Sequence, residues 1–255
     1  MAASGKDGSA TESPGRAVGP ADDGATETEA PALDLSRPGI PANAAFGDVY
    51  HSTDGALEEA REVFLGGCSL PGAWRGRERF TVAETGFGTG LNALATWRAR
   101  REDGARGRLR FVSIERYPFD RDALAALLAP FRAELGDEID ALLDAWPGRV
   151  AGVHALELDG LDLELWHMDV AEALARMRIR ADAWFLDGFA PSRNPAMWSA
   201  AVLARVAELS VPGARLATFT VAGAVRRALE DAGFDVRRAP GFGRKRQRLE
   251  ARLPG

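Results

Sequence analysis

Short apolar runs and amphipathic stretches alternate along the chain from about residue 46 onward. A short apolar run predicts a buried strand, and apolar residues that recur every three to four positions predict a helix. The predicted strands are 80–84, 109–115, 156–158, 161–166, 183–187, 215–220 and two more near the C-terminus. The predicted helices are 56–64, 91–101, 120–129, 137–145, a short one after Asp169, 196–209 and 222–232. Strands that alternate with helices predict a doubly wound α/β sheet, in which 156–158 and 161–166 form a hairpin around Asp159-Gly160.

The first 34 residues differ from the rest in composition. They are rich in Ala, Gly, Ser, Thr, Asp and Glu and contain no aromatic residue, so they bury too little apolar surface to offset the entropy of ordering. They carry two basic and seven acidic residues, which accounts for the whole net charge of −5. We therefore predict a disordered acidic tail over residues 1–34 and one globular domain of balanced charge over residues 35–255.

Several protein classes are not expected. Charges interrupt every apolar run before about 18 residues, and no apolar stretch follows the N-terminus, so neither a membrane span nor a secretory signal is predicted. One cysteine and three scattered histidines give no metal-ligand spacing. We expect a cytoplasmic protein without a metal site. A cluster of basic residues near the C-terminus leaves a polyanionic partner open despite the acidic total.

Acidic residues stand at or just after the ends of four predicted strands. In doubly wound sheets, ligands bind beyond the carboxyl ends of the strands, so these side chains are expected to lie together at one edge of the sheet. The four acids are Glu84, Glu115, Asp169 and Asp187.

The loop after the first of these strands is rich in glycine and leads into a helix. It reads Glu84-Thr-Gly86-Phe-Gly88-Thr-Gly90. Glycine lets the backbone approach a ligand that a side chain would hold away. Leu91 stands where the dinucleotide fingerprint Gly-x-Gly-x-x-Gly has its last glycine, so an NAD-dependent dehydrogenase is not expected. An acid two residues before the first glycine suits a ligand with an ammonium group; the alternative is an ordinary glycine-rich turn.

The other three acids each have two interpretations. Glu115 can accept both hydroxyls of a ribose, or it can be merely solvated. Asp169 can accept from an adenine amino group, and it can also be the N-cap of the next helix. Asp187 opens the segment Asp-Gly-Phe189-Ala-Pro191, where a charge directly after Ala-Trp-Phe-Leu is costly unless it emerges at the sheet edge. There Phe189 can stack on a planar group; a plain strand-to-loop turn is the alternative.

Six longer segments together resemble one known family. They are Asp48-Val-Tyr-His-Ser-x-Asp-Gly-x-x-Glu58, Glu84-x-Gly-Phe-Gly-Thr-Gly-Leu-Asn92, Trp184-Phe-Leu-Asp-Gly-Phe-Ala-Pro-x-x-Asn-Pro-x-Met-Trp198, Leu216-Ala-Thr-Phe-Thr220, Val225-Arg-Arg-x-Leu229 and Gly241-Phe-Gly-Arg-Lys-Arg246. From about residue 44 to 250 the chain resembles the methyltransferase domain of the tRNA 5-methylaminomethyl-2-thiouridine biosynthesis protein. His51 departs from the pattern, in which an aromatic residue such as Phe is expected.

The resemblance implies the fold and the reaction. The fold would be that of a class I S-adenosylmethionine-dependent methyltransferase, a Rossmann-like, seven-stranded, mostly parallel sheet with helices on both faces. The reaction would transfer a methyl group from S-adenosyl-L-methionine to the aminomethyl nitrogen on C5 of the wobble (2-thio)uridine in the anticodon loop of tRNA.

The resemblance also implies roles for individual residues, with Asp187 as the catalytic residue that faces the substrate amine. The cofactor would be held by Glu84, Gly86, Gly88, Gly90, Asn92, Glu115 and Asp169. The substrate would be contacted by Tyr50, Ser52, Asp54, Phe189, Pro191, Phe242, Arg244, Lys245 and Arg246. The last three are candidates for tRNA phosphates, with a merely solvated basic surface as the alternative.

Members of the family often carry a second, FAD-dependent oxidase domain. This chain resembles the stand-alone form or a piece of a longer protein, and a separate FAD-dependent oxidase is a predicted partner. Two other functions stay open. One is an aminopropyltransferase or another small-amine N-methyltransferase on the same fold; the other is a non-catalytic module that binds RNA or the oxidase. Acids at all four strand ends favour an enzyme.

Overall fold

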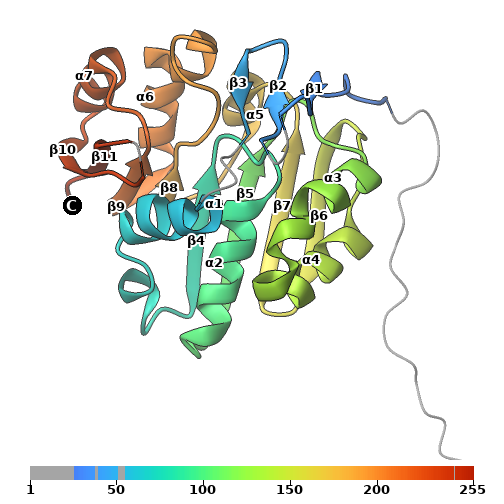
Figure 1. Ribbon diagram of the computed structural model, residues 1–255. Helices are drawn as coiled ribbons and strands as arrows, with labels where there is room; N and C mark the ends of the chain where they lie inside the picture. Colours follow the sequence, from blue (N-terminus) through green and yellow to red (C-terminus); the bar gives the residue numbers. More distant parts are fainter. Residues whose placement is uncertain (1–25, 38–39, 51–54, 244) are drawn as a thin grey trace, which may run out of the picture.

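Five parallel strands form the middle of an eight-stranded sheet in the computed structural model, which describes residues 26–37, 40–50, 55–243 and 245–255 (Figure 1). The strands are β4 (Arg79–Glu84), β5 (Arg108–Ile114), β6 (Gly152–Leu158), β7 (Leu161–His167), β8 (Ala181–Phe185), β9 (Ser210–Thr218), β10 (Asp235–Pro240) and β11 (Gln247–Arg252). Their order is β10-β11-β9-β8-β4-β5-β7-β6. β6, β10 and β11 pair in the antiparallel sense and lie toward the two edges.

Helices cover both faces of this sheet. One layer holds α1 (Ala56–Glu59), its π-helical continuation η1 (Ala60–Gly66), α2 (Leu91–Glu102), α3 (Arg121–Leu128) and α4 (Arg132–Ala145), which lie in front of the strands in Figure 1. The other layer holds α5 (Val170–Arg176), α6 (Ala200–Glu208) and α7 (Gly223–Asp231). Short 3-10 turns are η2 (Gly72–Trp74), η3 (Ala129–Phe131) and η4 (Pro195–Trp198).

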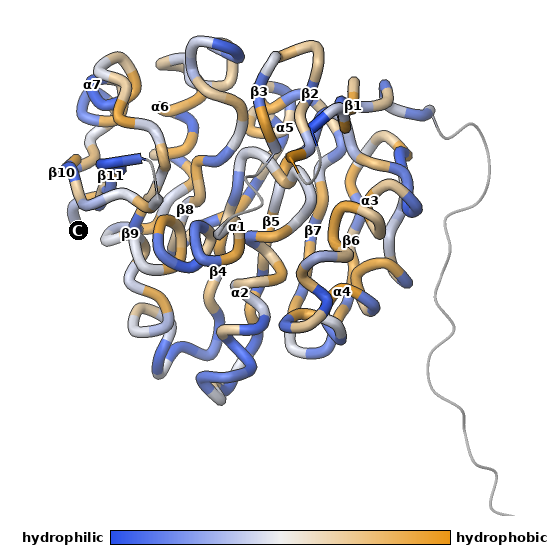
Figure 2. Tube along the Cα trace, viewed as in Figure 1, coloured by the Kyte–Doolittle hydropathy of each residue, from blue (hydrophilic) through white to orange (hydrophobic). Residues whose placement is uncertain are grey.

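Each helical layer has its own hydrophobic core. Leu94, Phe111 and Leu135 belong to the cluster under α2 and α4, and Trp184 and Leu229 belong to the cluster under α5, α6 and α7. Because a parallel strand covered on both faces has no solvent side, β8 is a nearly continuous apolar run and not an alternating one. Figure 2 shows hydrophobic positions along the strands and hydrophilic ones at the lower end of α2 and the neighbouring loop.

A small antiparallel sheet lies beside the carboxyl ends of the parallel strands. It consists of β1 (Leu33–Asp34), β2 (Ala42–Asn43) and β3 (Asp48–Val49) (Figure 1). Upstream of it, Glu27 forms a bridge with Val150 and an ion pair of 2.8 Å with Arg149.

Residues 26–34 of the predicted acidic tail therefore lie against the domain. These contacts are made largely by backbone groups, which need no apolar side chains, so composition does not reveal them. The prediction of disorder for residues 1–25 concerns residues outside those that the structure describes.

The sheet agrees with the predicted α/β class and with the eight strands that the hydrophobic pattern predicts, one more than the seven that the resemblance implies. The edge strand β6 pairs with β7 through the predicted hairpin, with Leu158 opposite Leu161. The predicted helix over 137–145 begins earlier, at Arg132, and follows η3 directly. Among the described residues, no helix is both long and apolar enough to cross a membrane.

Candidate active site

A cavity of about 660 Å³ opens beyond the carboxyl ends of β4, β5 and β8. Five segments far apart in the sequence form its walls. They are the end of β3 with Tyr50, α1 and η1, the glycine loop 86–92, the loop 187–190 after β8, and Phe242, Gly243 and Lys245 between β10 and β11. The location agrees with the rule for ligand sites in open α/β sheets.

The glycine loop is packed closely against the loop after β8. A Cβ atom on Gly86 would lie 2.9 Å from the carbonyl oxygen of Asp187, so that position has no room for a side chain. Gly90 has φ +77°, and a Cβ there would lie 2.5 Å from the Phe87 ring. Thr85 Oγ1 donates to the carbonyl oxygen of Asp187 at 2.8 Å, which fixes the two loops relative to each other.

The Asn92 side chain joins two carboxylates inside the cavity wall. Its amide nitrogen donates to Glu84 Oε1 and to Asp187 Oδ2, both at 2.8 Å. Ser113 Oγ donates to Glu84 Oε2 at 2.6 Å, and the backbone N–H of Gly188 donates to Asp187 Oδ1 at 2.8 Å. All these donors are neutral, and among the described residues no Lys or Arg forms an ion pair with either acid.

Both carboxyl groups have raised pKa values. Burial raises the pKa of the fully buried Glu84 well above its usual range, and the negative charge of Asp187 raises it further. Burial also raises the pKa of Asp187 to about 6, although the Gly188 N–H, the Lys245 charge and Asn92 oppose the shift. Two acids that share one neutral amide are poised to accept positive charge from a ligand.

Glu115 and Asp169 occupy different surroundings. Glu115 lines the cavity, and its two oxygens accept the backbone N–H groups of Gly88 and Tyr117, each at 2.8 Å. Asp169 does not line the cavity. It caps α5 by accepting from the Ala171 N–H at 2.9 Å and pairs with Arg116 at 3.1 Å, so the predicted N-cap is confirmed.

Aromatic rings gather where the loop after β8 meets β3. Phe189 stacks on Phe46 with 4.6 Å between ring centroids and meets Tyr50 edge-on at 5.4 Å. Asp48 Oδ2 accepts the Ala190 N–H at 2.8 Å, and Trp198 Nε1 donates to the Phe189 carbonyl oxygen at 2.9 Å. The small N-terminal sheet and η4 thus hold this loop from two sides.

The basic residues near the C-terminus have different partners and different exposure in the folded protein. Arg237 and Arg248 both pair with the buried Glu250. Lys245 turns to the cavity, where it pairs with Glu59 at 2.7 Å. Arg238 and Arg246 are exposed and have no carboxylate partner among the described residues.

The cavity collects about half of the residues predicted for the site. It is lined by Tyr50, Gly86, Gly88, Asn92, Glu115, Asp187, Phe189, Phe242 and Lys245. It is not lined by Glu84, Gly90, Asp169, Pro191 and Arg246, of which Glu84 lies directly behind Asn92. Three predicted residues lie outside the described part of the chain, namely Ser52, Asp54 and Arg244.

Four residues of the site were missed from the sequence. Ser113 left a signal, because a hydroxyl in the buried run of β5 needs a partner. Asp48 begins one of the resemblance segments but received no role of its own. Phe46 and Glu59 carry no local signal, since their contacts come from segments more than 100 residues away.

Comparison with known proteins agrees with this geometry. Residues 133–254 match a family model described as S-adenosyl-L-methionine-dependent methyltransferase. The chain is 54% identical over 226 residues to the tRNA 5-methylaminomethyl-2-thiouridine biosynthesis bifunctional protein MnmC of Maricaulis maris, covering 88% of this chain and 38% of that protein. The protein of the same description from Caulobacter sp. (strain K31) is also 54% identical, with 85% and 37% covered.

A solved structure has the same fold. The crystal structure of MNMC2 from Aquifex aeolicus superposes with a TM-score of 0.71 at 22% identity, covering 85% of this chain and 68% of that one. The chain spans less than two fifths of the length of the two curated relatives described above.

Proposed function

We propose that this chain, which matches an S-adenosyl-L-methionine-dependent methyltransferase family model over residues 133–254 and resembles part of the MnmC proteins, methylates tRNA. The acceptor is the aminomethyl nitrogen on C5 of a wobble uridine. The observation that carries the proposal is the series of contacts Glu84–Asn92–Asp187. In this proposal the acid behind the glycine loop serves the cationic cofactor, and the acid that lines the cavity serves the amine.

The residues present fit S-adenosyl-L-methionine. Glu84 is fully buried and accepts from two neutral donors, Asn92 and Ser113, so it can balance the positive charge of the amino acid part of the cofactor. Gly86 and Gly88 leave the backbone free to approach a ligand, and each Glu115 oxygen keeps a lone pair for a ribose hydroxyl. When bound, the cofactor supplies a methyl group that is already activated by its sulfonium centre.

The chain's own residues then have to align and deprotonate the acceptor. Alignment for an in-line attack can contribute about 7–11 kcal/mol. An alkyl amine is mostly protonated at neutral pH, and only its neutral form attacks. Asp187 accepts a hydrogen bond from the amine, orients its lone pair and takes its proton. Its partners Asn92 and Gly188 hold the carboxylate in place for this role.

The mouth of the cavity suits a nucleotide that has left its stack. Phe189, Phe46 and Tyr50 provide aromatic surface for a flipped base. Arg238 and Arg246 are exposed, have no carboxylate partner within the described ranges of the chain, and are candidates to bind the phosphates of the anticodon stem. The matched relatives are described as bifunctional, and a separate FAD-dependent oxidase as partner is part of the same proposal.

The test is methyl transfer to defined acceptors. The protein is incubated with labelled S-adenosyl-L-methionine and tRNA that lacks only this methylation, and the nucleosides are then separated. We expect label solely in the 5-methylaminomethyl nucleoside, and none when the wobble uridine is replaced by cytidine. Label in a small diamine and not in tRNA would identify a small-amine transferase on the same fold and overturn the proposal.

A further inference from the structure

One ion pair lines the acceptor side of the cavity and has no part in the reaction described so far. Lys245 Nζ lies 2.7 Å from Glu59 Oε1. Both residues line the same cavity as Asp187, although they come from α1 and from the segment between β10 and β11. The phosphate contact expected for Lys245 stays a prediction; in the structure its ammonium group pairs with Glu59 at the cavity.

The pair is held in position by its surroundings. The Lys245 ammonium lies 4.3 Å from the centroid of the Phe219 ring, which favours a cation there. At the start of α1, a Cβ atom on Gly55 would lie 2.9 Å from the Phe242 ring, so α1 and the β10–β11 segment are in close contact. Glu59 is the less exposed partner, with a side-chain exposure of 20% against 48% for Lys245.

Charged and titratable groups from several elements share the cavity with Asp187. They are Asp48 and Tyr50 at the end of β3, Glu59 of α1, Glu115 after β5 and Lys245 between β10 and β11. Glu84 lies behind the cavity lining, and the neutral Asn92 amide donates to both Glu84 and Asp187. The Lys245 charge lowers the pKa of Asp187, and the Glu59 charge raises it. The two members of the Lys245–Glu59 ion pair therefore act on Asp187 with opposite signs.

We propose that Lys245 and Glu59 are positioning residues that set, in opposite senses, the pH range in which Asp187 is ionised and the acceptor amine is neutral. The role toward the amine rests on the proposed function, whereas the effect on Asp187 does not. A fixed cation beside the site favours the carboxylate form of Asp187 and disfavours a protonated amine. The Glu59 carboxylate holds the Lys245 ammonium in place and shifts both pKa values, that of Asp187 and that of the amine, in the opposite direction. In this proposal Lys245 therefore adjusts these pKa values and does not bind a phosphate.

The experiment compares charge-removing variants on the two sides of the pair. Lys245→Met, Glu59→Gln and the double variant are assayed for the pH dependence of kcat/KM in methyl transfer to tRNA. In parallel, the Asp187 carboxyl is titrated by ¹³C NMR without cofactor, with Asp187→Asn to assign its signal. Lys245→Arg keeps the charge, and Glu134→Gln removes the same charge from an exposed ion pair with Arg61.

Opposite shifts are the expected result. Lys245→Met moves the acid limb and the Asp187 titration to higher pH, and Glu59→Gln moves both to lower pH, by about 0.3 to 1 unit. The double variant falls between them, and the two controls leave both profiles in place. Shifts of the same sign, or no shift in the NMR titration, would overturn the inference. A wild-type protein inactive on tRNA would contradict the proposed function, while the NMR titration would still decide the role of the pair.

Discussion

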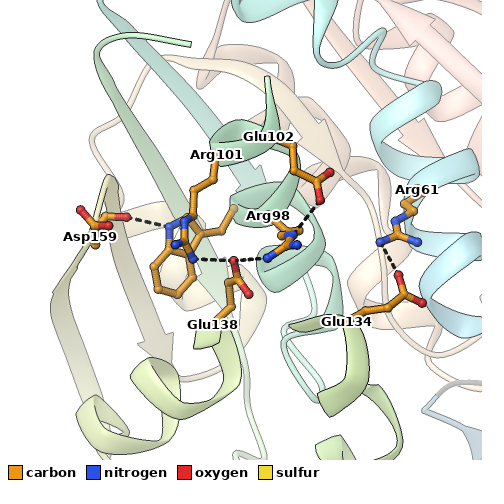
Figure 3. A network of polar contacts seen from close by, with 8 residues as sticks. Arg61, Arg98, Arg101, Glu102, Glu134, Glu138 and Asp159 are labelled. Carbon is orange, nitrogen blue, oxygen red and sulfur yellow. Dashed lines mark hydrogen bonds and ion pairs between the residues drawn. The ribbon is translucent and has the colours of Figure 1, made fainter. Parts of the chain in front are cut away.

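Buried carboxylates lie near both ends of α2, but the side chains that pair with them differ in charge. Near the C-terminal end, Glu138 of α4 is fully buried and pairs with Arg101 at 2.7 Å and Arg98 at 3.6 Å (Figure 3). At the N-terminal end, Glu84 is also fully buried, but its partners are the Asn92 amide and the Ser113 hydroxyl.

This difference in partners distinguishes a carboxylate with a structural role, Glu138, from one whose charge is available to a ligand, Glu84. Arginines on α2 neutralise Glu138, and the ion pairs join α2 to α4; Arg61 and Glu134 form a further link beside them (Figure 3). In the part of the chain that the structure describes, the hydrogen-bond partners of Glu84 are neutral, and a buried charge without a counter-ion is costly. Such a cost is consistent with a site whose counter-ion arrives with the ligand.

The largest expected effect is on turnover. Asp187→Asn removes the group that accepts the amine proton, so kcat for methyl transfer is expected to fall by about 10²- to 10⁴-fold. Affinity for S-adenosyl-L-methionine, measured by calorimetry, should change little. Asp162→Asn, which alters a carboxylate paired with Arg108 away from the cavity, is the matched control and should keep full activity. An equal loss of cofactor affinity and of turnover in Asp187→Asn would contradict the role of Asp187 as the group that accepts the amine proton.

A second prediction concerns the other acid of the site. Glu84→Gln removes the buried negative charge but keeps the shape and can still bond Asn92 and Ser113. A hydrogen bond to a charged group contributes about 1.5–3 kcal/mol, so cofactor affinity should fall by about 10- to 100-fold. Because burial raises the pKa of Glu84, the cofactor-free wild type should lose stability as the pH rises through that pKa, and Glu84→Gln should remove this loss in the unfolding midpoint. A lower midpoint would show that Glu84 is a structural acid like Glu138.

The same change at the opposite end of α2 should have the opposite sign. Glu138→Gln leaves Arg98 and Arg101 without their carboxylate, and since both are partly exposed, solvent recovers part of the loss. We expect the free energy of unfolding to fall by about 1–2 kcal/mol in urea denaturation. Cofactor affinity should stay at the wild-type value. If Glu138→Gln changed the cofactor affinity as much as Glu84→Gln, the proposed difference between the two ends of α2 would be wrong.

The smallest expected effect is the pH dependence of stability. The pKa of Asp187 is raised from 3.8 to about 6, so the stability that its protonated form contributes is present below about pH 4 and is lost as the pH rises through 6. Relative to Asp187→Asn, the cofactor-free wild type should lose stability across this window. The change should stay below the roughly 1.4 kcal/mol of one pKa unit, because solvent in the open cavity screens the charge. Urea denaturation between pH 4 and 7 measures it, and parallel curves for the two proteins would contradict the raised pKa.

Much of the site could be predicted from the properties of residues that are close together in the sequence. Strand 80–84, the glycine loop and the helix after it were all predictable, because hydrophobic period and glycine positions are local properties. The placement of Glu115 and Asp187 at the cavity followed from one rule about parallel strands. The cofactor roles of Glu84, Glu115 and Asp169 stay predictions.

Assignments that depended on a distant partner were the ones that changed. Lys245 belongs to a run of basic residues in the sequence, and only the packing of α1 against the β10–β11 segment turns it to the cavity and to Glu59. Likewise, Arg237 and Arg248 are neutralised by Glu250, which a count of charges cannot show.

The sequence by itself determined the class of fold, the glycine loop and the acids at the strand ends, since each follows from the order of residues within one strand, turn and helix. Only the tertiary structure decided which acids share Asn92, which are neutralised by arginine, and that an ion pair from α1 and the β10–β11 segment faces Asp187. The physical reason is that electrostatic interactions depend on distance in space and on burial. Neither is encoded in the spacing of residues along the chain.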